Sequence, residues 1–136
     1  MKSIMLACVL LLAVGCGKME SSGSAQRVPV NVQAIFTANC AKSGCHAGSS
    51  PQQEQNLSEE FAYANIVGVA SHEMPSLKRV DPGNPDNSYL VLKIEGVGIV
   101  GDRMPFDQLG SGPNGYLTQA EIDTIRAWIQ DGAPAR

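Results

Sequence analysis

The feature that most constrains this chain is the segment CAKSGCH at positions 40–46. Two cysteines enclose four residues, and a histidine follows the second cysteine directly. A C-x-x-C-H pattern is typical of covalent attachment of a c-type haem, and this segment is a variant with a longer gap. In such a site each cysteine sulfur adds to one vinyl group of the porphyrin, and the histidine binds iron. The segment therefore predicts that Cys40 and Cys45 hold a haem c through thioether bonds and that His46 is the proximal iron ligand.

Three other interpretations of these residues stay open. Cys40 and Cys45 can form a disulfide, whose short loop would contribute only about 2 kcal/mol of stability. A zinc ion can be bound by both cysteines with His46 and His72, although structural zinc sites usually space their ligands further apart. A free reactive thiol is the third interpretation, and the second cysteine nearby argues against it. We favour haem because its attachment chemistry explains the layout of the two cysteines and the histidine.

Length and composition limit the number of domains and the classes of partner that the chain can have. A chain of 136 residues suits one domain, and a net charge of -3 gives no basic surface for nucleic acid, so no nucleic-acid partner is expected. Aromatic residues make up only 5% of the chain, which is low for a protein that must bury a core. A large, flat, apolar cofactor would make up much of that deficit.

The N-terminus predicts export and a membrane anchor. Residues 1–15 contain Lys2 and a short apolar run that is too short to cross a bilayer, as in a signal peptide. The sequence ending at Cys16 resembles a bacterial lipoprotein signal, in which this cysteine becomes lipid-modified; an ordinary signal peptide cut elsewhere is the alternative. We therefore expect a lipoprotein signal peptide, lipidation at Cys16, and a flexible tether over residues 16–30. The expected location is a bacterial cell envelope, at the outer membrane facing the periplasm or the exterior.

The first half of the predicted domain, which covers residues 31–136, contains two expected helices. Asn31 is expected to cap a helix with Val32, Ile35 and Phe36 on one side, and this helix runs into the cysteine segment. Ser58 is expected to cap a second helix that ends near Gly68. The polar residues 47–57 between them predict a loop.

The second half contains one ambiguous segment and one clear helix. The apolar pattern of residues 89–95 fits strand or helix, and we predict a short helix with Lys93 exposed. Residues 96–115 are rich in glycine and predict a loop. Thr118 and Glu121 then form a capping box, followed by a stripe of isoleucines that predicts a helix ending at Gly132. The predicted fold class is therefore all-α.

Together these features resemble a single-haem c-type cytochrome domain of the kind found in bacterial exported proteins. The resemblance covers about residues 31–134 and rests on IFTANCAKSGCH, RVDPGNPDNSYLVLKIEG, RMP and LTQAEIDTIRAWIQDGA. It implies a small cytochrome c-like haem bundle of four to five short helices with long loops. It also implies that Met104 is the distal iron ligand. Met74 and His72 stay open as alternatives, because both methionines precede a proline and local geometry does not choose between them.

Three functions fit these expectations. The leading hypothesis is a membrane-tethered electron carrier that exchanges electrons with an unknown redox protein. The second is a haem enzyme or gas sensor with an open distal site, and the third is a haem-free envelope binding module with a Cys40–Cys45 disulfide. Nothing in the sequence points to hydrolase or transferase chemistry, so we expect an electron-transfer protein rather than an enzyme.

Overall fold

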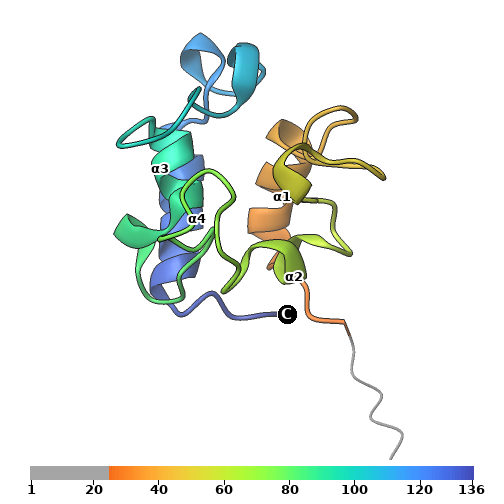
Figure 1. The fold of residues 1–136 in the computed structure, drawn as a ribbon, viewed down its shortest axis with the longest axis vertical. Helices are drawn as coiled ribbons and strands as arrows, with labels where there is room; N and C mark the ends of the chain where they lie inside the picture. The colour runs from red at the N-terminus through yellow and green to blue at the C-terminus, as the bar shows by residue number, and fades with distance from the viewer. Residues whose placement is uncertain (1–24) are drawn as a thin grey trace, which may run out of the picture.

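The computed structural model describes residues 25–136, which fold into helices joined by long loops (Figure 1). The α-helices of this range are α1 (Val30–Asn39), α2 (Ala62–Ile66), α3 (Tyr89–Glu95) and α4 (Gln119–Gln130). Short 3-10 turns interrupt the loops, and residues 25–136 contain no β-strand. The predicted all-α class with long loops is confirmed. The predicted signal peptide, residues 1–15, and the predicted lipidation site Cys16 lie outside the described residues.

Helix α4 forms as its local sequence predicts. The Thr118 hydroxyl accepts a hydrogen bond from the Glu121 backbone, and the Glu121 carboxylate accepts one from the Thr118 backbone, which completes the capping box. One face of the helix is buried through Ile122, Ile125, Trp128 and Ile129. The helix ends just before Gly132, whose φ of 92° suits glycine.

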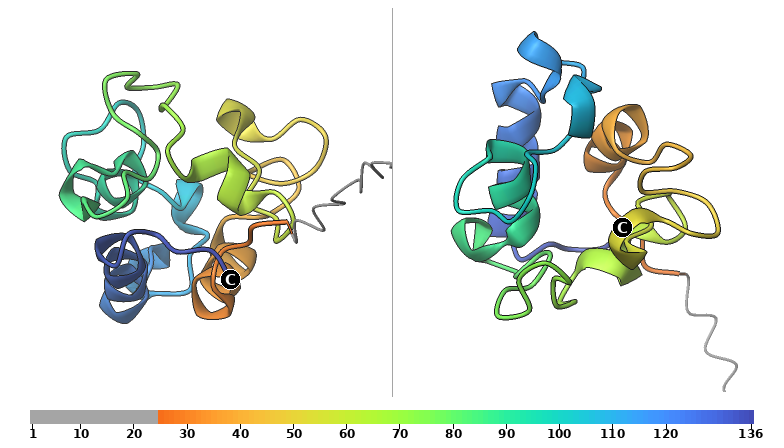
Figure 2. Two further views of the ribbon diagram at one scale, coloured as in Figure 1. Left: turned by 90° about the horizontal axis from the view of Figure 1, so that it is seen from below. Right: turned by 45° about the horizontal axis from the view of Figure 1, so that its top comes forward.

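Helix α4 is the centre of the fold, because both α1 and α3 pack against it. The core between them is mostly aliphatic, with Phe36 and Trp128 as aromatic members, and its fully buried side chains include Val32, Phe36, Val91, Ile125 and Ile129. Burial of each such side chain contributes about 1.5–3 kcal/mol. Figure 2 shows that α3 and α4 form one side of the molecule, while α1, α2 and the loop between them form the other. No helix within residues 25–136 combines the length and apolar character needed to cross a membrane.

Two helix starts differ from the predictions. Helix α1 begins at Val30 after Pro29, whose carbonyl accepts the first helical hydrogen bond, so Asn31 lies inside the helix and does not cap it. The fixed φ of proline suits a helix start, and this effect outweighs the capping preference of asparagine. The second helix is also shorter than predicted. Ser58 only begins a turn, and the regular helix α2 starts at Ala62.

Helix α3 is confirmed, but Lys93 is not exposed as predicted. Only 8% of the residue is accessible to solvent. Its ammonium group lies 2.9 Å from the Glu73 carboxylate and donates to the Val100 carbonyl at 3.0 Å. These partners come from loops on either side of α3 in the sequence. The apolar pattern of residues 89–95 alone could therefore not predict these contacts of Lys93.

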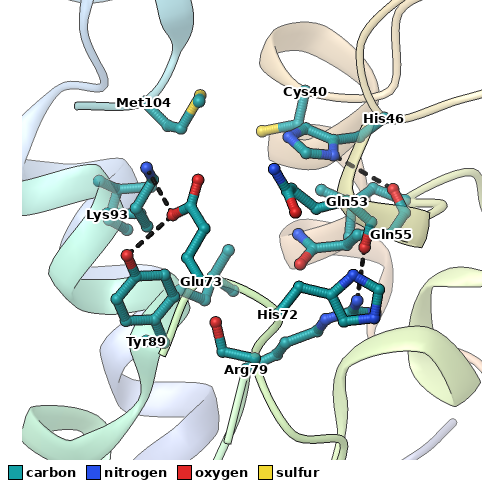
Figure 3. A pocket seen from close by; sticks show the side chains of 14 residues that line it. Cys40, His46, Gln53, Gln55, His72, Glu73, Arg79, Tyr89, Lys93 and Met104 are labelled. Atoms are coloured by element: carbon teal, nitrogen blue, oxygen red, sulfur yellow. Dashed lines mark hydrogen bonds and ion pairs between the residues drawn. The ribbon is translucent and has the colours of Figure 1, made fainter. Parts of the chain in front are cut away.

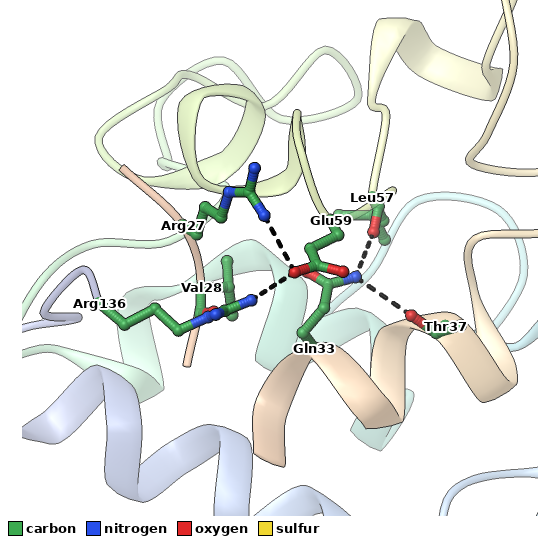
Figure 4. A network of polar contacts seen from close by, with 7 residues as sticks. All are labelled: Arg27, Val28, Gln33, Thr37, Leu57, Glu59 and Arg136. Carbon is green, nitrogen blue, oxygen red and sulfur yellow. Dashed lines mark hydrogen bonds and ion pairs between the residues drawn. The ribbon is translucent and has the colours of Figure 1, made fainter. Parts of the chain in front are cut away.

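The two ends of the described chain are joined (Figure 4). Arg136 donates from its backbone to the Arg27 carbonyl and from its side chain to the Val28 carbonyl, both at 2.9 Å. Arg27 and Arg136 both donate to Glu59, and the hydrogen bond from Arg136 is the main cause of the lowered pKa of that carboxyl. Val28 is fully buried. The folded part therefore begins inside residues 16–30, the range predicted as tether.

Candidate functional site

A cleft opens between the two sides of the molecule. Its inner part holds about 580 Å³ of space, partly open to solvent, and an outer part of about 1020 Å³ continues it. Both parts are bordered by Cys40, His46, Gln53, Glu73 and Met104. Three of the four residues predicted to hold haem therefore border both parts of the cleft.

The cysteine segment forms one wall of the cleft. Cys40 follows the last residue of α1, and the chain then turns so that the His46 backbone donates to the Cys40 carbonyl at 3.2 Å. Gly44 adopts a φ of 80° in this turn, a value that glycine tolerates and that lets the longer gap close. Cys45 borders the outer part of the cleft. No disulfide joins Cys40 and Cys45 in this structure.

The His46 ring is held in an orientation that suits a metal ligand. Its Nδ1 lies 3.2 Å from the Gln55 carbonyl, which can only accept a hydrogen bond. Nδ1 therefore carries the proton, and Nε2 keeps its lone pair. Burial lowers the pKa of His46 and outweighs its backbone hydrogen bonds, which act in the opposite direction. The ring is therefore neutral at pH 7, as a ligand must be.

Cys40 is electrostatically different from an exposed cysteine. Burial, followed by the charge of Glu121, raises the pKa of its thiol to about 12. Glu121 is fixed near this point because its carboxylate accepts hydrogen bonds from Asn39 and from Ser111. The folded chain therefore keeps Cys40 protonated at neutral pH, and a protonated thiol is a weak nucleophile.

Met104 lies on the opposite wall, facing Cys40 and His46 across the cleft (Figure 3). Its backbone donates to the Lys93 carbonyl at 2.9 Å, which attaches this loop to α3. The two alternative ligands are placed differently. Met74 is not among the residues that border the cleft. His72 borders its inner part, but 46% of its side chain is exposed and its ring lies 3.6 Å from Glu54.

The alternative zinc site has no assembled ligand set in the described part of the chain. Among the described side chains of residues 25–136, which do not include Asp107, no group of three or more His, Cys, Asp or Glu residues is arranged to hold a metal ion.

A polar cluster beside Met104 was not predicted from the sequence. Tyr89 donates to the Glu73 carboxylate at 2.8 Å and accepts from the Val100 backbone at 3.1 Å, while Lys93 bonds to Glu73 and Val100. Burial acts to raise the pKa of Glu73, but the hydrogen bonds from Lys93 and Tyr89 prevail and hold that pKa below its usual value. One signal was present, since residues four apart on a helix share a face. Tyr89 and Lys93 have this spacing.

Arg79 also borders the cleft. It begins the segment RVDPGNPDNSYLVLKIEG, which contributes to the family resemblance, but its place in the cleft was not predicted because its hydrogen-bond partners come from other loops. Comparisons of the chain with protein-family models, curated proteins and solved structures found no match. The residues of the cleft themselves must therefore indicate the function.

Proposed function

We propose that this protein is a membrane-tethered electron carrier that binds one covalent haem c in the cleft. One observation carries the proposal. The cysteine segment and Met104 are far apart in the sequence, yet they face each other across one cleft (Figure 3). The sequence motif alone requires only that Cys40, Cys45 and His46 lie together. The position of Met104 on the facing wall is an independent feature that supports axial ligation from both sides.

The residues of the cleft fit a haem group in their chemistry. The two free thiols supply the thioether sulfurs, and the lone pair on His46 Nε2 supplies the proximal ligand. The Met104 sulfur supplies the distal ligand, and methionine–histidine ligation raises the reduction potential. The haem provides the one-electron chemistry. An iron held by both His46 and Met104 would have no position open to a substrate, which favours a carrier over an enzyme.

Apolar residues of the core extend into the wall of the cleft. Leu57, Leu90 and Ile94 belong to the hydrophobic core and also border the inner part of the cleft. A flat apolar ligand packed against them would continue the core and exclude water from it. This arrangement supports a porphyrin more than a small polar ligand.

The redox partner is a second protein whose identity the cleft does not specify.

Mass spectrometry tests the proposal. The full chain is produced in a host that matures c-type cytochromes and is then denatured before measurement. We expect one haem to remain attached in the parent and none in a variant with both Cys40→Ser and Cys45→Ser. A parent mass that matches only free thiols or a disulfide would show that the proposal is wrong. Rapid binding of carbon monoxide to the loaded parent would instead indicate an open distal site and favour a sensor.

A further inference from the structure

Arg79 is a buried cation on the wall of the cleft (Figure 3). Only 5% of the residue is exposed. Its guanidinium donates to three backbone carbonyls, those of Gln53 at 2.6 Å, Asn65 at 2.7 Å and Glu54 at 3.4 Å. Carbonyl groups satisfy hydrogen bonds but carry no full negative charge. Among the side chains that the structure describes, which do not include Asp107, no carboxylate forms an ion pair with Arg79, although a buried charge is costly without one.

The other arginines of the described residues are placed differently. The more exposed ones all have carboxylate partners, namely Arg27, Arg126 and Arg136. Arg103 is partly exposed and stacks over the Tyr116 ring, with its guanidinium carbon 4.2 Å from the ring centre. The arginine buried most deeply is therefore the one without a charge partner or a stacking partner in this part of the chain.

The charges of the cleft point to an anionic ligand. Its inner part is bordered by two cations, Arg79 and Lys93, and by one carboxylate, Glu73, which is 2.9 Å from Lys93. The cleft is therefore locally positive, although the whole chain has a net charge of -3. Burial lowers the pKa of Arg79, and the charge of Glu54 opposes this only in part. Removing a cation from water acts in this direction, because burial disfavours its charged form.

The Arg79 guanidinium also has more N–H donors than its three carbonyl partners use. Arginine has five N–H donors, and the three hydrogen bonds to carbonyls use three of them. Two donors remain, which matches the two oxygens of a carboxylate. We propose that Arg79 is the carboxylate-binding residue of this cleft. Resting on the proposed function, the carboxylate is a propionate group of the haem.

The test separates carboxylate recognition from a structural role. The haem-free full chain is titrated with iron-free protoporphyrin and with its dimethyl ester, which lacks the two negative charges, and binding is followed by porphyrin fluorescence. Hydrogen bonds to charged groups contribute about 1.5–3 kcal/mol, so the parent should prefer the diacid by about tenfold or more. Arg79→Gln should reduce this preference to near unity. Arg79→Lys keeps the charge and should retain part of it.

The matched control is Arg126→Gln, since Arg126 does not border the cleft and lies on α4 with Glu95 and Asp86 as partners. This variant should keep the parental preference. If Arg79→Gln weakens the diacid and the ester equally, Arg79 only supports the fold and the inference is overturned. Equal binding of the two porphyrins by the parent would also overturn it.

This experiment distinguishes the inference from the proposed function. A chain that attaches no haem in the maturing host but prefers the diacid through Arg79 would retain a carboxylate site without being a cytochrome. A chain that carries covalent haem but shows no Arg79-dependent preference would be an electron carrier that holds its propionates elsewhere. The proposed function is therefore tested by haem attachment, and the role of Arg79 is tested separately by the preference for the diacid.

Discussion

Replacing Lys93 by methionine tests the buried charge cluster beside Met104. Methionine has a similar length and no charge, so the change removes the cation while it preserves most of the packing. The Glu73 carboxylate then loses the ammonium group 2.9 Å away, and the Val100 carbonyl loses its donor. We expect a large loss of stability for a single lysine, because this lysine is only 8% exposed.

The expected loss of stability follows from the burial of the Lys93–Glu73 ion pair. Removing one partner of a buried ion pair costs about 3–5 kcal/mol. Two features reduce this value, since the Glu73 side chain is 20% exposed and Tyr89 still donates to its carboxylate. We therefore expect Lys93→Met to lower the free energy of unfolding by about 2–3 kcal/mol. At about 4 °C for each kcal/mol in a domain of about 100 residues, the melting temperature should fall by about 10 °C.

The assay is a double-mutant cycle in thermal and urea unfolding. Lys93→Met and Glu73→Gln each leave an unpaired group, whereas the double variant leaves none, so its loss should be at least about 1 kcal/mol smaller than the sum of the single losses. Lys78→Met is the matched control, because the Lys78 side chain is 51% exposed in its pair with Asp81. This control should leave the melting temperature unchanged. Strict additivity of the two single changes would refute the reasoning.

The same cycle has a defined pH dependence. The folded state holds the pKa of Glu73 below the unfolded value of about 4.3. Its ion pair therefore stabilises the fold fully above that unfolded value, and the stabilisation is lost as the pH falls through the lower folded value. The difference in stability between the parent and Lys93→Met should shrink below about pH 4. A difference that grows in acid would contradict the assignment of Glu73 as the charged partner.

Three further predictions concern the ligand, the anchor and the fold. Met104→Ala should remove the weak sulfur-to-iron band at the red end of the oxidised spectrum and lower the reduction potential, while Met74→Ala should leave both unchanged. Cys16→Ser should move the protein from the membrane fraction to the soluble fraction, because the lipid chains are lost. Thr118→Ala removes the capping box of α4 and should cost about 1 kcal/mol of stability in urea unfolding.

The parts of the fold that could be predicted are those with local causes. The capping box and the isoleucine stripe of α4 act within one helix, so both the start and the buried face were predicted. The start of α1 depended on the competition between Pro29 and Asn31, and the capping preference alone chose the wrong residue. The burial of Lys93 depends on Glu73 and Val100, which folding brings to it from two loops.

The residues of the candidate site also differ in whether the local sequence could predict them. Cys40, Cys45 and His46 are neighbours in the sequence, so their spacing alone was informative. The position of Met104 required the fold, because its loop is held to α3 through the Lys93 carbonyl. Arg79 begins the segment RVDPGNPDNSYLVLKIEG, which contributes to the family resemblance, but the sequence did not predict a role for it. That role is recognised from its burial and from the lack of an ion pair with any described carboxylate.

The cleft is best understood as a core that is completed by its ligand. Leu57 and Ile94 are at most 2% exposed and still border the cleft, so the aliphatic part of the core continues to its wall. The neighbouring Arg79 forms no ion pair with any carboxylate whose side chain the structure describes. A ligand with a broad apolar face and carboxylates at one edge would satisfy both features at once. Because the contacts of such a ligand with the cleft wall form only in the folded state, they would add to the stability of the domain.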